Sequence, residues 1–273
     1  MLTGIDKNTR KIAAVMVIVG ATGDLVSKKI VPALFHAYTA RQLPRNFRII
    51  GFARRPFTDV EFQKRIKDIL KEHGLRAPQK DVVAFSKLFS YHQGFFDQPK
   101  AYEDLKKILG AIDRKIKAPV NKLFYFAVPP QNYQEILKNL VASGLTKTPG
   151  PKKSWTRVLV EKPFGTDYKS SEELDNLLAK LFKEEQIYRI DHYLAKEMLQ
   201  EILAFRFSNN IFENIWCREF ISSIDIRLWE SIGVEHRGNF YDKVGALRDV
   251  GQNHLLQMLA LVAMEKPADF SAD

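Results

Sequence analysis

The stretch that most constrains the fold lies near the amino terminus, where an apolar run meets a glycine-containing turn. Residues 13–19 are all apolar and several are β-branched, which is typical of a strand buried on both faces of a parallel sheet. Gly20-Ala-Thr-Gly-Asp-Leu25 follows, and residues 27–38 then show a helical apolar period. A strand, a glycine turn and a helix open a dinucleotide-binding fold. The spacing Gly-x-x-Gly leaves a tight strand-to-helix turn as the alternative.

Further apolar runs predict the remaining strands of a parallel sheet. They alternate with helical apolar periods, a pattern that favours an α/β fold with a helix between successive strands. The predicted strands cover residues 13–19, 47–53, 89–92, 122–128 and 157–160, and helices are predicted at 59–72, 100–109, 132–142 and 167–182. Ligands of such open sheets bind at the carboxyl ends of the strands.

Three residues at the ends of predicted strands are candidates for cofactor contacts. Arg54 follows the second strand, where NAD-binding folds carry an acidic residue for the ribose 2′-hydroxyl. An arginine suits a 2′-phosphate instead, so Arg54 favours NADP over NAD. Tyr133 and Lys162 follow later strands at the same expected edge. A packed tyrosine and a solvated lysine are the alternatives.

A second group of polar residues lies in Arg189-Ile-Asp-His-Tyr-Leu-Ala-Lys-Glu197, which brings Asp, His, Tyr and Lys within six positions. A helix that opens at Lys196 would point His192 and Lys196 in the same direction, because they are four residues apart. A cation, an imidazole and the N–H groups of a helix entrance suit a phosphate. A solvated helix start with an incidental histidine is the alternative.

The carboxyl-terminal third supplies a candidate base. Residues 219–227 alternate as a strand of a second, antiparallel sheet would, and residues 246–264 predict a long helix. His254 lies on the apolar stripe of this helix, yet polar residues surround it. A buried histidine with a carboxylate partner, here Asp191 or Asp249, is tuned to act as a general base near neutral pH. A hydrogen-bonded core histidine is the alternative.

The charge balance limits the partners of the chain. Its 42 Lys+Arg against 32 Asp+Glu give a net charge of +10, which favours anionic partners such as phosphorylated metabolites and dinucleotides. No basic block is long enough for a nucleic-acid tail.

The single cysteine, Cys217, excludes an internal disulfide and fits a reducing compartment. The longest apolar run, residues 255–264, is too short to span a membrane. We therefore expect a cytoplasmic protein without a metal, nucleic-acid or membrane partner.

Together these motifs resemble one family, the glucose-6-phosphate dehydrogenases, from about Val15 to Pro267. The segment 189–197 is the most specific, because few folds would repeat it by chance. The matching motifs are Gly20-Ala-Thr-Gly-Asp-Leu25, Gly51-Phe-Ala-Arg54, Val128-Pro-Pro130 with Tyr133, Glu161-Lys-Pro-Phe-Gly165, Arg189 to Glu197, and Arg248-Asp249 with Gln252-Asn-His-Leu-Leu-Gln257. The resemblance implies oxidation of glucose 6-phosphate to 6-phosphogluconolactone, with hydride transfer to NADP.

The resemblance also implies two domains. Residues 1–190 would form a Rossmann-type parallel sheet that binds NADP. Residues 191–273 would begin an α+β domain with an antiparallel sheet, which carries the substrate site and the subunit interface. Chains of the family continue past this point, so we expect the second domain to be truncated. The alternative function is therefore a truncated, non-catalytic NADP-binding fragment, and the full-length form is expected to be a homo-oligomer.

The roles that the resemblance implies fall into two groups. One group would bind NADP at the pyrophosphate, the 2′-phosphate or the nicotinamide: Gly20, Thr22, Gly23, Asp24, Leu25, Arg54, Tyr133 and Lys162. The other would bind the sugar phosphate or the sugar hydroxyls: Lys162, His192, Tyr193, Lys196, Glu230 and Asp249. His254 would be the general base, and Asp191 would orient it.

Overall fold

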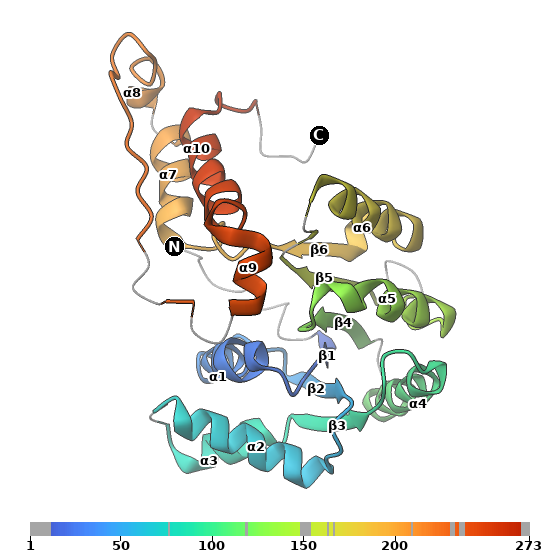
Figure 1. The fold of residues 1–273 in the computed structure, drawn as a ribbon. Helices are drawn as coiled ribbons and strands as arrows, with labels where there is room; N and C mark the ends of the chain where they lie inside the picture. Colours follow the sequence, from blue (N-terminus) through green and yellow to red (C-terminus); the bar gives the residue numbers. More distant parts are fainter. Residues whose placement is uncertain are drawn as a thin grey trace. The chain divides into compact units, whose positions relative to one another are not determined.

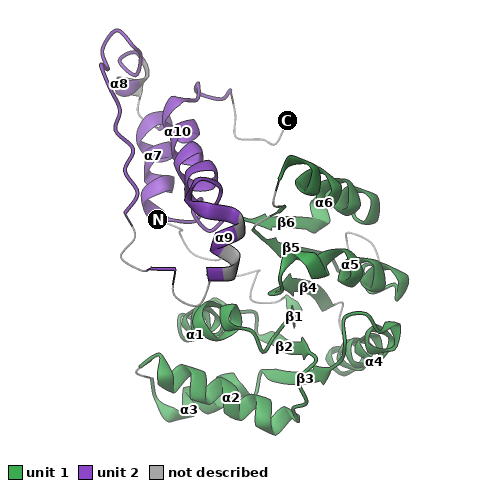
Figure 2. Ribbon diagram, in the orientation of Figure 1, with its two compact units in different colours: residues 1–190 green, residues 191–273 purple. Residues whose placement is uncertain are grey.

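The chain divides into two compact units in the computed structural model, Met1–Ile190 (unit 1) and Asp191–Asp273 (unit 2) (Figure 2). Whether they are the expected cofactor and substrate domains stays a prediction. The structure describes residues 12–75, 77–117, 120–147, 154–162, 164–165, 167–208, 210–229, 233–234 and 238–268.

Unit 1 is built on a six-stranded sheet with the order β3-β2-β1-β4-β5-β6, and every pair of neighbours is parallel (Figure 1). The strands are β1 (Ala13–Val19), β2 (Asn46–Ala53), β3 (Phe89–Gln93), β4 (Val120–Phe126), β5 (Thr156–Glu161) and β6 (Ile187–Ile190). This order is that of a doubly wound dinucleotide-binding sheet, so the predicted fold class is confirmed for unit 1. The edge strand β6 was not predicted, because only one of its four residues is buried.

Helices cover both faces of this sheet (Figure 1). Those packed on one face are α1 (Val31–Thr39), α2 (Asp59–Glu72) and α3 (Gln79–Ser86), with a π-helical turn η2 (Val26–Ile30) before α1. Those on the other face are α4 (Pro99–Ile116), α5 (Tyr133–Ala142) and α6 (Tyr168–Leu181). Two short 3-10 turns, η3 (Pro130–Asn132) and η4 (Glu184–Gln186), complete the unit among the described residues. The sequence did not predict α3, since eight residues give too few turns to establish a period.

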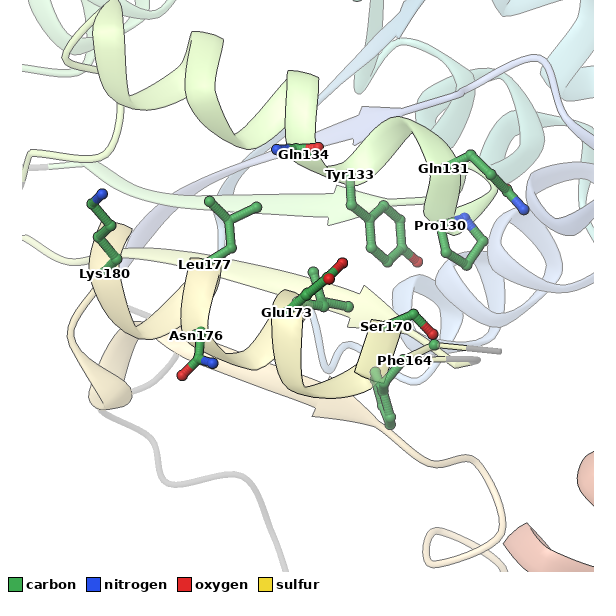
Figure 3. Close-up of a pocket in the computed structure, with 12 residues that line it drawn as sticks. Pro130, Gln131, Tyr133, Gln134, Phe164, Ser170, Glu173, Asn176, Leu177 and Lys180 are labelled. Atoms are coloured by element: carbon green, nitrogen blue, oxygen red, sulfur yellow. The ribbon is translucent and has the colours of Figure 1, made fainter. Parts of the chain in front are cut away.

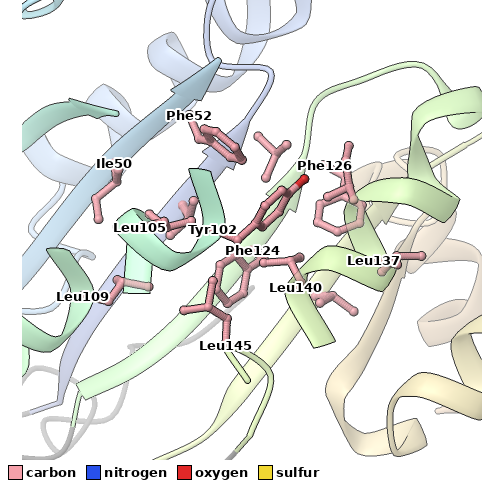
Figure 4. Close-up of a cluster of buried hydrophobic side chains, with 14 of the residues drawn as sticks. Ile50, Phe52, Tyr102, Leu105, Leu109, Phe124, Phe126, Leu137, Leu140 and Leu145 are labelled. Carbon is pink, nitrogen blue, oxygen red and sulfur yellow. The ribbon is translucent and has the colours of Figure 1, made fainter. Parts of the chain in front are cut away.

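The core of unit 1 has two layers, separated by the sheet. Successive residues of β1 enter opposite layers, as the strand period of two requires: Val15 and Val17 pack with α4 and α5, while Met16 and Ile18 pack with α1 and α2. All seven residues of β1 are buried. Figure 4 shows the first layer, in which Tyr102 lies among leucine and phenylalanine side chains. This double burial explains why the strands read as continuous apolar runs.

The start of α6 is fixed by a capping box. The Asp167 carboxylate accepts a hydrogen bond from the Ser170 N–H (2.8 Å), and the Asp167 N–H donates to Ser170 Oγ (3.1 Å). Two N–H groups at this helix end are thereby satisfied. The helix predicted at 167–182 is thus present as α6, with Asp167 as its N-cap.

Unit 2 is helical in its described part. It contains α7 (Glu197–Phe207), the single turn α8 (Asn210–Glu213), α9 (Gly238–Ala246), a π-helical segment η6 (Leu247–Leu255) and α10 (Leu256–Ala263). Its small core comprises Tyr193, Leu199 and Met258. The predicted helix at 246–264 is confirmed, with a π-helical first half.

The strand predicted at 219–227 is wrong for this structure. Residues 221–229 carry no strand assignment, although they lie outside the helices and follow an alternating apolar pattern. A strand is defined by hydrogen bonds to a neighbour, and no described segment pairs with this one. Of the expected antiparallel sheet, the described part of unit 2 contains no strand.

Candidate functional site

The carboxyl ends of β1 and β4 form the point where the strand order of unit 1 reverses. β1 ends at Val19, and the N–H of Gly20 then donates to the carbonyl of Phe52 in β2 (2.8 Å). The N–H of Ala127, just beyond β4, donates to the carbonyl of Val19 (2.9 Å). The turn at Gly20 is therefore tied to the neighbouring strands on both sides.

Gly20 occupies a position that no side chain fits. Its φ is +87°, in the left-handed region, and an added Cβ would lie 2.4 Å from the carbonyl oxygen of Ala127 and 2.6 Å from Cγ1 of Val128. Gly23 closes the turn by donating its N–H to the Gly20 carbonyl (2.9 Å). The predicted glycine turn is thus present, and its first glycine is required both by conformation and by contact.

The helix after this turn begins with accessible residues. Thr22 is partly exposed, and Asp24 and Leu25 are exposed. The chain then continues through Val26–Ile30 into α1. The first-turn N–H groups and the positive end of the helix dipole are the features that bind a pyrophosphate. The site fits that group, and the contacts expected of Thr22, Asp24 and Leu25 stay predictions.

Arg54 leaves the sheet at the same edge as the glycine turn, because the parallel register places Phe52 of β2 opposite Val19 of β1. Its side chain is exposed. Its carbonyl accepts a hydrogen bond from Nε2 of Gln93 (3.2 Å), which fixes the backbone of the strand end. An exposed guanidinium on a fixed backbone suits the 2′-phosphate that the sequence assigns to it.

Tyr133 lies inside unit 1 at the start of α5, with only 1% of its surface exposed. Its hydroxyl donates to the carbonyl of Glu161, the residue before Lys162 (3.1 Å). Burial raises the pKa of Tyr133 to about 12. The hydrogen bond of Tyr133 therefore stabilises the end of β5. The nicotinamide contacts expected of Tyr133 and Lys162 stay predictions.

A second tyrosine holds the same strand end, and the sequence analysis missed it. The hydroxyl of Tyr125 donates to the carboxylate of Glu161. Burial, followed by the neighbouring Glu161 carboxylate, raises the pKa of Tyr125. In the sequence Tyr125 looks like another apolar residue of its strand. Only the motif around Glu161 could have indicated that this strand end has a partner.

A pocket of about 590 Å³ opens between α5 and α6 in unit 1 (Figure 3). Tyr133 and Phe164 form part of its apolar wall, and Glu173 and Lys180 contribute charged groups from α6. The pocket adjoins the end of β5, so it lies beside the strand end that carries Lys162.

In unit 2 four of the predicted site residues meet around the ring of Tyr193. The Tyr193 ring stacks on the His254 ring with centroids 3.5 Å apart and planes inclined by 16°. Nζ of Lys196 lies 3.6 Å from the centroid of the Tyr193 ring. The His192 ring lies 5.1 Å from Tyr193 and 5.3 Å from His254. We refer to these four residues as the His–Tyr–Lys cluster.

The arrangement of the cluster differs from the helical one expected from the sequence. Residues 192–195 form turns, Lys196 precedes α7 as its N-cap, and the helix begins at Glu197. The expectation that His192 and Lys196 share a helix face is therefore wrong. They meet through Tyr193 instead, and both have exposed side chains, whereas Tyr193 and His254 are 5% and 3% exposed. A buried imidazole thus lies next to an exposed cation and a second imidazole.

His254 belongs to the nine-residue π-helical segment Leu247–Leu255. In this wider helix the Nδ2 of Asn253 donates to the carbonyl of Arg248, five residues earlier (3.0 Å). π-helical turns are rare and concentrate at functional sites. The apolar period of the sequence could not reveal it, since the pattern also fits an ordinary helix.

The three acidic residues predicted for the site in unit 2 are Asp191, Asp249 and Glu230. Asp191 accepts a hydrogen bond from the Tyr193 N–H through Oδ1 (2.9 Å), which fixes the turn beneath the cluster. Asp249 lies in η6 and is partly exposed. Glu230 lies outside the described residues. The roles assigned to these carboxylates, including the orientation of His254 by Asp191, stay predictions.

No helix in the described part of the chain has both the length and the apolar character needed to cross a membrane.

Comparison with known proteins links both units to one family. The sequence model of the glucose-6-phosphate dehydrogenase NAD binding domain matches residues 17–201, and that of the glucose-6-phosphate dehydrogenase C-terminal domain matches residues 203–273. The chain is 40% identical to glucose-6-phosphate 1-dehydrogenase of Chlamydia muridarum over 262 residues, and 43% identical to that of Dictyostelium discoideum over 260 residues. These alignments include 94% of this chain but only 52% and 50% of the relatives. The chain therefore spans about half the length of the curated relatives it matches.

Solved structures agree with this relationship. A glucose-6-phosphate dehydrogenase in complex with its substrate glucose-6-phosphate is similar to this chain with a TM-score of 0.86 and 38% identity, over 96% of this chain and 54% of that one. Glucose-6-phosphate 1-dehydrogenase from Mycobacterium avium gives a TM-score of 0.81 and 36% identity, over 96% of this chain and 55% of the other. The chain belongs to the glucose-6-phosphate dehydrogenase family.

Proposed function

We propose that the chain carries the machinery for oxidising glucose 6-phosphate to 6-phosphogluconolactone with reduction of NADP. The observation that carries the proposal is the His–Tyr–Lys cluster, in which a buried histidine lies against a tyrosine that an exposed lysine covers. It combines a candidate base with a candidate phosphate site in a member of the glucose-6-phosphate dehydrogenase family.

Unit 1 would hold NADP at the carboxyl edge of its sheet. The glycine turn at Gly20 would bring backbone close to the pyrophosphate, and the amino end of the helix that follows would bind it. Arg54 would bind the 2′-phosphate, which NAD lacks. Lys162, at the end of β5, would contact both the nicotinamide and the substrate.

Unit 2 would hold the phosphorylated sugar. His192 and Lys196 present two exposed nitrogen groups next to the buried ring of Tyr193, whose hydroxyl would complete the phosphate site. A phosphate with several acceptor oxygens suits such donors. Binding at the phosphate supplies energy away from the reacting carbon and orients the sugar. Glu230 and Asp249 would bind sugar hydroxyls.

His254 would act as the general base. Oxidation of the sugar hemiacetal breaks the C1–H bond and removes the proton of the C1 hydroxyl. The bound NADP supplies the acceptor for the hydride. The imidazole of His254 would take the proton, Asp191 would orient that ring, and the proton would then pass to solvent. In the structure the His254 side chain is 3% exposed and stacks on Tyr193.

A second candidate function follows from the length of the relatives. Because the chain spans about half of each, it can be a non-catalytic fragment that binds NADP without turnover. We propose for the whole protein a cytoplasmic location, a homo-oligomeric state, and no nucleic-acid or membrane partner.

The test is steady-state reduction of NADP by this chain, followed by ultraviolet absorbance, beside a calorimetric titration of NADP. Glucose 6-phosphate, free glucose and 6-phosphogluconate are compared as substrates. The proposal predicts turnover with glucose 6-phosphate and much less with the other two. NADP binding without turnover supports the fragment, and turnover that prefers free glucose or 6-phosphogluconate contradicts the proposed substrate.

A further inference from the structure

The short loop that carries Arg54 joins β2 to α2, and β2 lies beside β3 in the sheet (Figure 1). It comprises residues 54–57, which we call the Arg54 loop. The main-chain pairing of β2 with β3 ends at the pair Ala53–Gln93. The backbone of the Arg54 loop therefore lies beyond this pairing, and its placement depends on side chains of the neighbouring strand.

Two side chains of β3 bind the backbone where the Arg54 loop begins. The hydroxyl of Tyr91 donates a bifurcated hydrogen bond to the carbonyls of Ala53 (3.1 Å) and Arg55 (2.5 Å). The carbonyl of Arg54 accepts a hydrogen bond from Nε2 of Gln93 (3.2 Å). Tyr91 and Gln93 are two positions apart on β3, so both side chains leave the same face of that strand. Three successive carbonyls are therefore held from one face of β3.

The far end of the Arg54 loop is held as well. The N–H of Tyr91 donates to the carboxylate of Asp59 (2.7 Å), the first residue of α2. Thr58, the N-cap of α2, forms a capping box with Glu61. The ring of Phe57 packs edge-on against the ring of Tyr91, with centroids 5.5 Å apart. Tyr91 thus contacts the beginning of the loop through its hydroxyl, and the end of the loop through its ring and its N–H.

The hydroxyl of Tyr91 stays a hydrogen-bond donor at neutral pH. Burial raises the pKa of Tyr91 to about 12, and the nearby guanidinium of Arg55 opposes this shift only in part. The phenolic proton is therefore present across the neutral range. The side chain of Arg54 is exposed, so these hydrogen bonds fix the backbone of Arg54 while its guanidinium faces solvent.

We propose that Tyr91 and Gln93 are positioning residues that set the preference for NADP over NAD through Arg54. The inference rests on the proposed binding of the 2′-phosphate by Arg54. A guanidinium binds a phosphate best in a planar two-point geometry, which a fixed backbone favours. Ordering a loop upon binding costs affinity, and hydrogen bonds that exist before binding remove this cost. NAD lacks the 2′-phosphate, so its affinity should not depend on the two residues.

A purely structural role for the same hydrogen bonds is the alternative. They would then stabilise unit 1 as a whole, and their loss would weaken the binding of NADP and NAD alike. The two roles also differ in a chain that lacks the guanidinium. If Tyr91 and Gln93 act through Arg54, their replacement after Arg54→Ala should have no further effect on NADP binding.

The test is calorimetric titration of NADP and of NAD into Tyr91→Phe, Gln93→Ala and the double variant. The double variant should lose about tenfold in NADP affinity and less than about twofold in NAD affinity, because about one residue of backbone must be ordered upon binding the 2′-phosphate. Each single variant should lose less than the double variant, since the other side chain still holds the loop. The same two substitutions added to Arg54→Ala should cause no further loss of NADP affinity.

Two matched controls remove hydrogen bonds from side chains to backbone carbonyls outside the Arg54 loop. Tyr102→Phe removes the bond to the carbonyl of Phe96 (2.8 Å), and Gln63→Ala removes the bond to the carbonyl of Phe89 (2.8 Å). Both should leave the ratio of NADP affinity to NAD affinity unchanged. Gln93 is exposed, so Gln93→Ala keeps the proposal testable even if the double variant fails to fold.

Three outcomes would overturn the proposal: equal losses of NADP and NAD affinity, a loss of the same size in the Arg54→Ala background, and an unchanged NADP affinity in the double variant. Arg54→Ala measured alone identifies what has failed. If it lowers NADP affinity and the double variant does not, only the positioning role fails. If it leaves the ratio of the two affinities unchanged, the proposed 2′-phosphate contact fails, and the positioning role fails with it.

Discussion

Replacement of Gly20 by alanine tests the geometry of the proposed cofactor site. The new Cβ would lie 2.4 Å from the Ala127 carbonyl oxygen, which belongs to backbone that β1 holds through the hydrogen bond to Val19. It would also meet Cγ1 of Val128 at 2.6 Å. Since neither the turn nor the end of β4 can move freely, the substitution must displace one of them.

Two contributions set the magnitude. A side chain at φ +87° costs about 1–2 kcal/mol, and insertion of a group into packed surroundings costs about 1–3 kcal/mol more. We therefore expect Gly20→Ala to lower the free energy of unfolding by about 2–5 kcal/mol. Gly74 is the matched control, because its φ is +60° but nothing lies within 4 Å of its added Cβ. Gly74→Ala should cost only the first contribution.

The assay is urea unfolding of the three chains, with the midpoint and the slope fitted for each. Calorimetric titration of NADP into the folded variants follows. Gly20→Ala should lose more stability than Gly74→Ala and should bind NADP more weakly, while Gly74→Ala keeps the original affinity. Equal losses of stability for both variants would refute the close approach of the turn to β4.

Four further predictions concern individual side chains. Arg54→Ala should weaken NADP binding by about 1.5–3 kcal/mol, the value of a hydrogen bond to a charged group, and should leave NAD binding nearly unchanged. Calorimetry with both cofactors measures the difference, and equal losses of affinity for NADP and NAD would contradict the 2′-phosphate assignment. His254→Asn should lower turnover about 10²–10⁴-fold with little effect on NADP affinity, and an unchanged rate would remove the base assignment. Lys196→Ala should raise the KM for glucose 6-phosphate and leave any turnover of free glucose alone, which a comparison of the two substrates checks. The pKa of Tyr133 in the folded chain is about 12, above the unfolded value of about 10. Its contribution to stability is therefore complete below about pH 10 and is lost as the pH rises toward 12. Urea unfolding across this alkaline range should show a smaller loss of unfolding free energy in Tyr133→Phe than in the original chain.

The sheet of unit 1 was predictable because its strands are buried on both faces. Residues 13–19 and 47–53 read as apolar runs, and the structure places strands at Ala13–Val19 and Asn46–Ala53. The edge strand Ile187–Ile190 was missed, since exposed Tyr188 and Arg189 interrupt its pattern. Burial on two sides leaves a clear signal in the sequence, and burial on one side of a short segment does not.

In unit 2 the sequence predicted which candidate residues lie together better than it predicted their arrangement. His192, Lys196 and His254 were selected by residue type and motif, and the structure brings all three around Tyr193. The stack of Tyr193 on His254 joins residues about sixty positions apart in a π-helical setting, and no local period reports such a contact. The strand predicted at 219–227 was wrong because alternating apolar and polar residues indicate which face of a segment is buried. They do not show whether a partner strand is present to pair with it.

A single-turnover experiment tests the central claim most directly. The chain is loaded with NADP, mixed with an excess of glucose 6-phosphate, and followed through the near-ultraviolet absorbance of NADPH, with His254→Asn measured in parallel. The account predicts close to one equivalent of NADPH for each NADP-loaded site in the original chain, and almost none on the same timescale in the variant. No NADPH from a chain that calorimetry shows to bind both NADP and glucose 6-phosphate, or equal amounts from both chains, would contradict it.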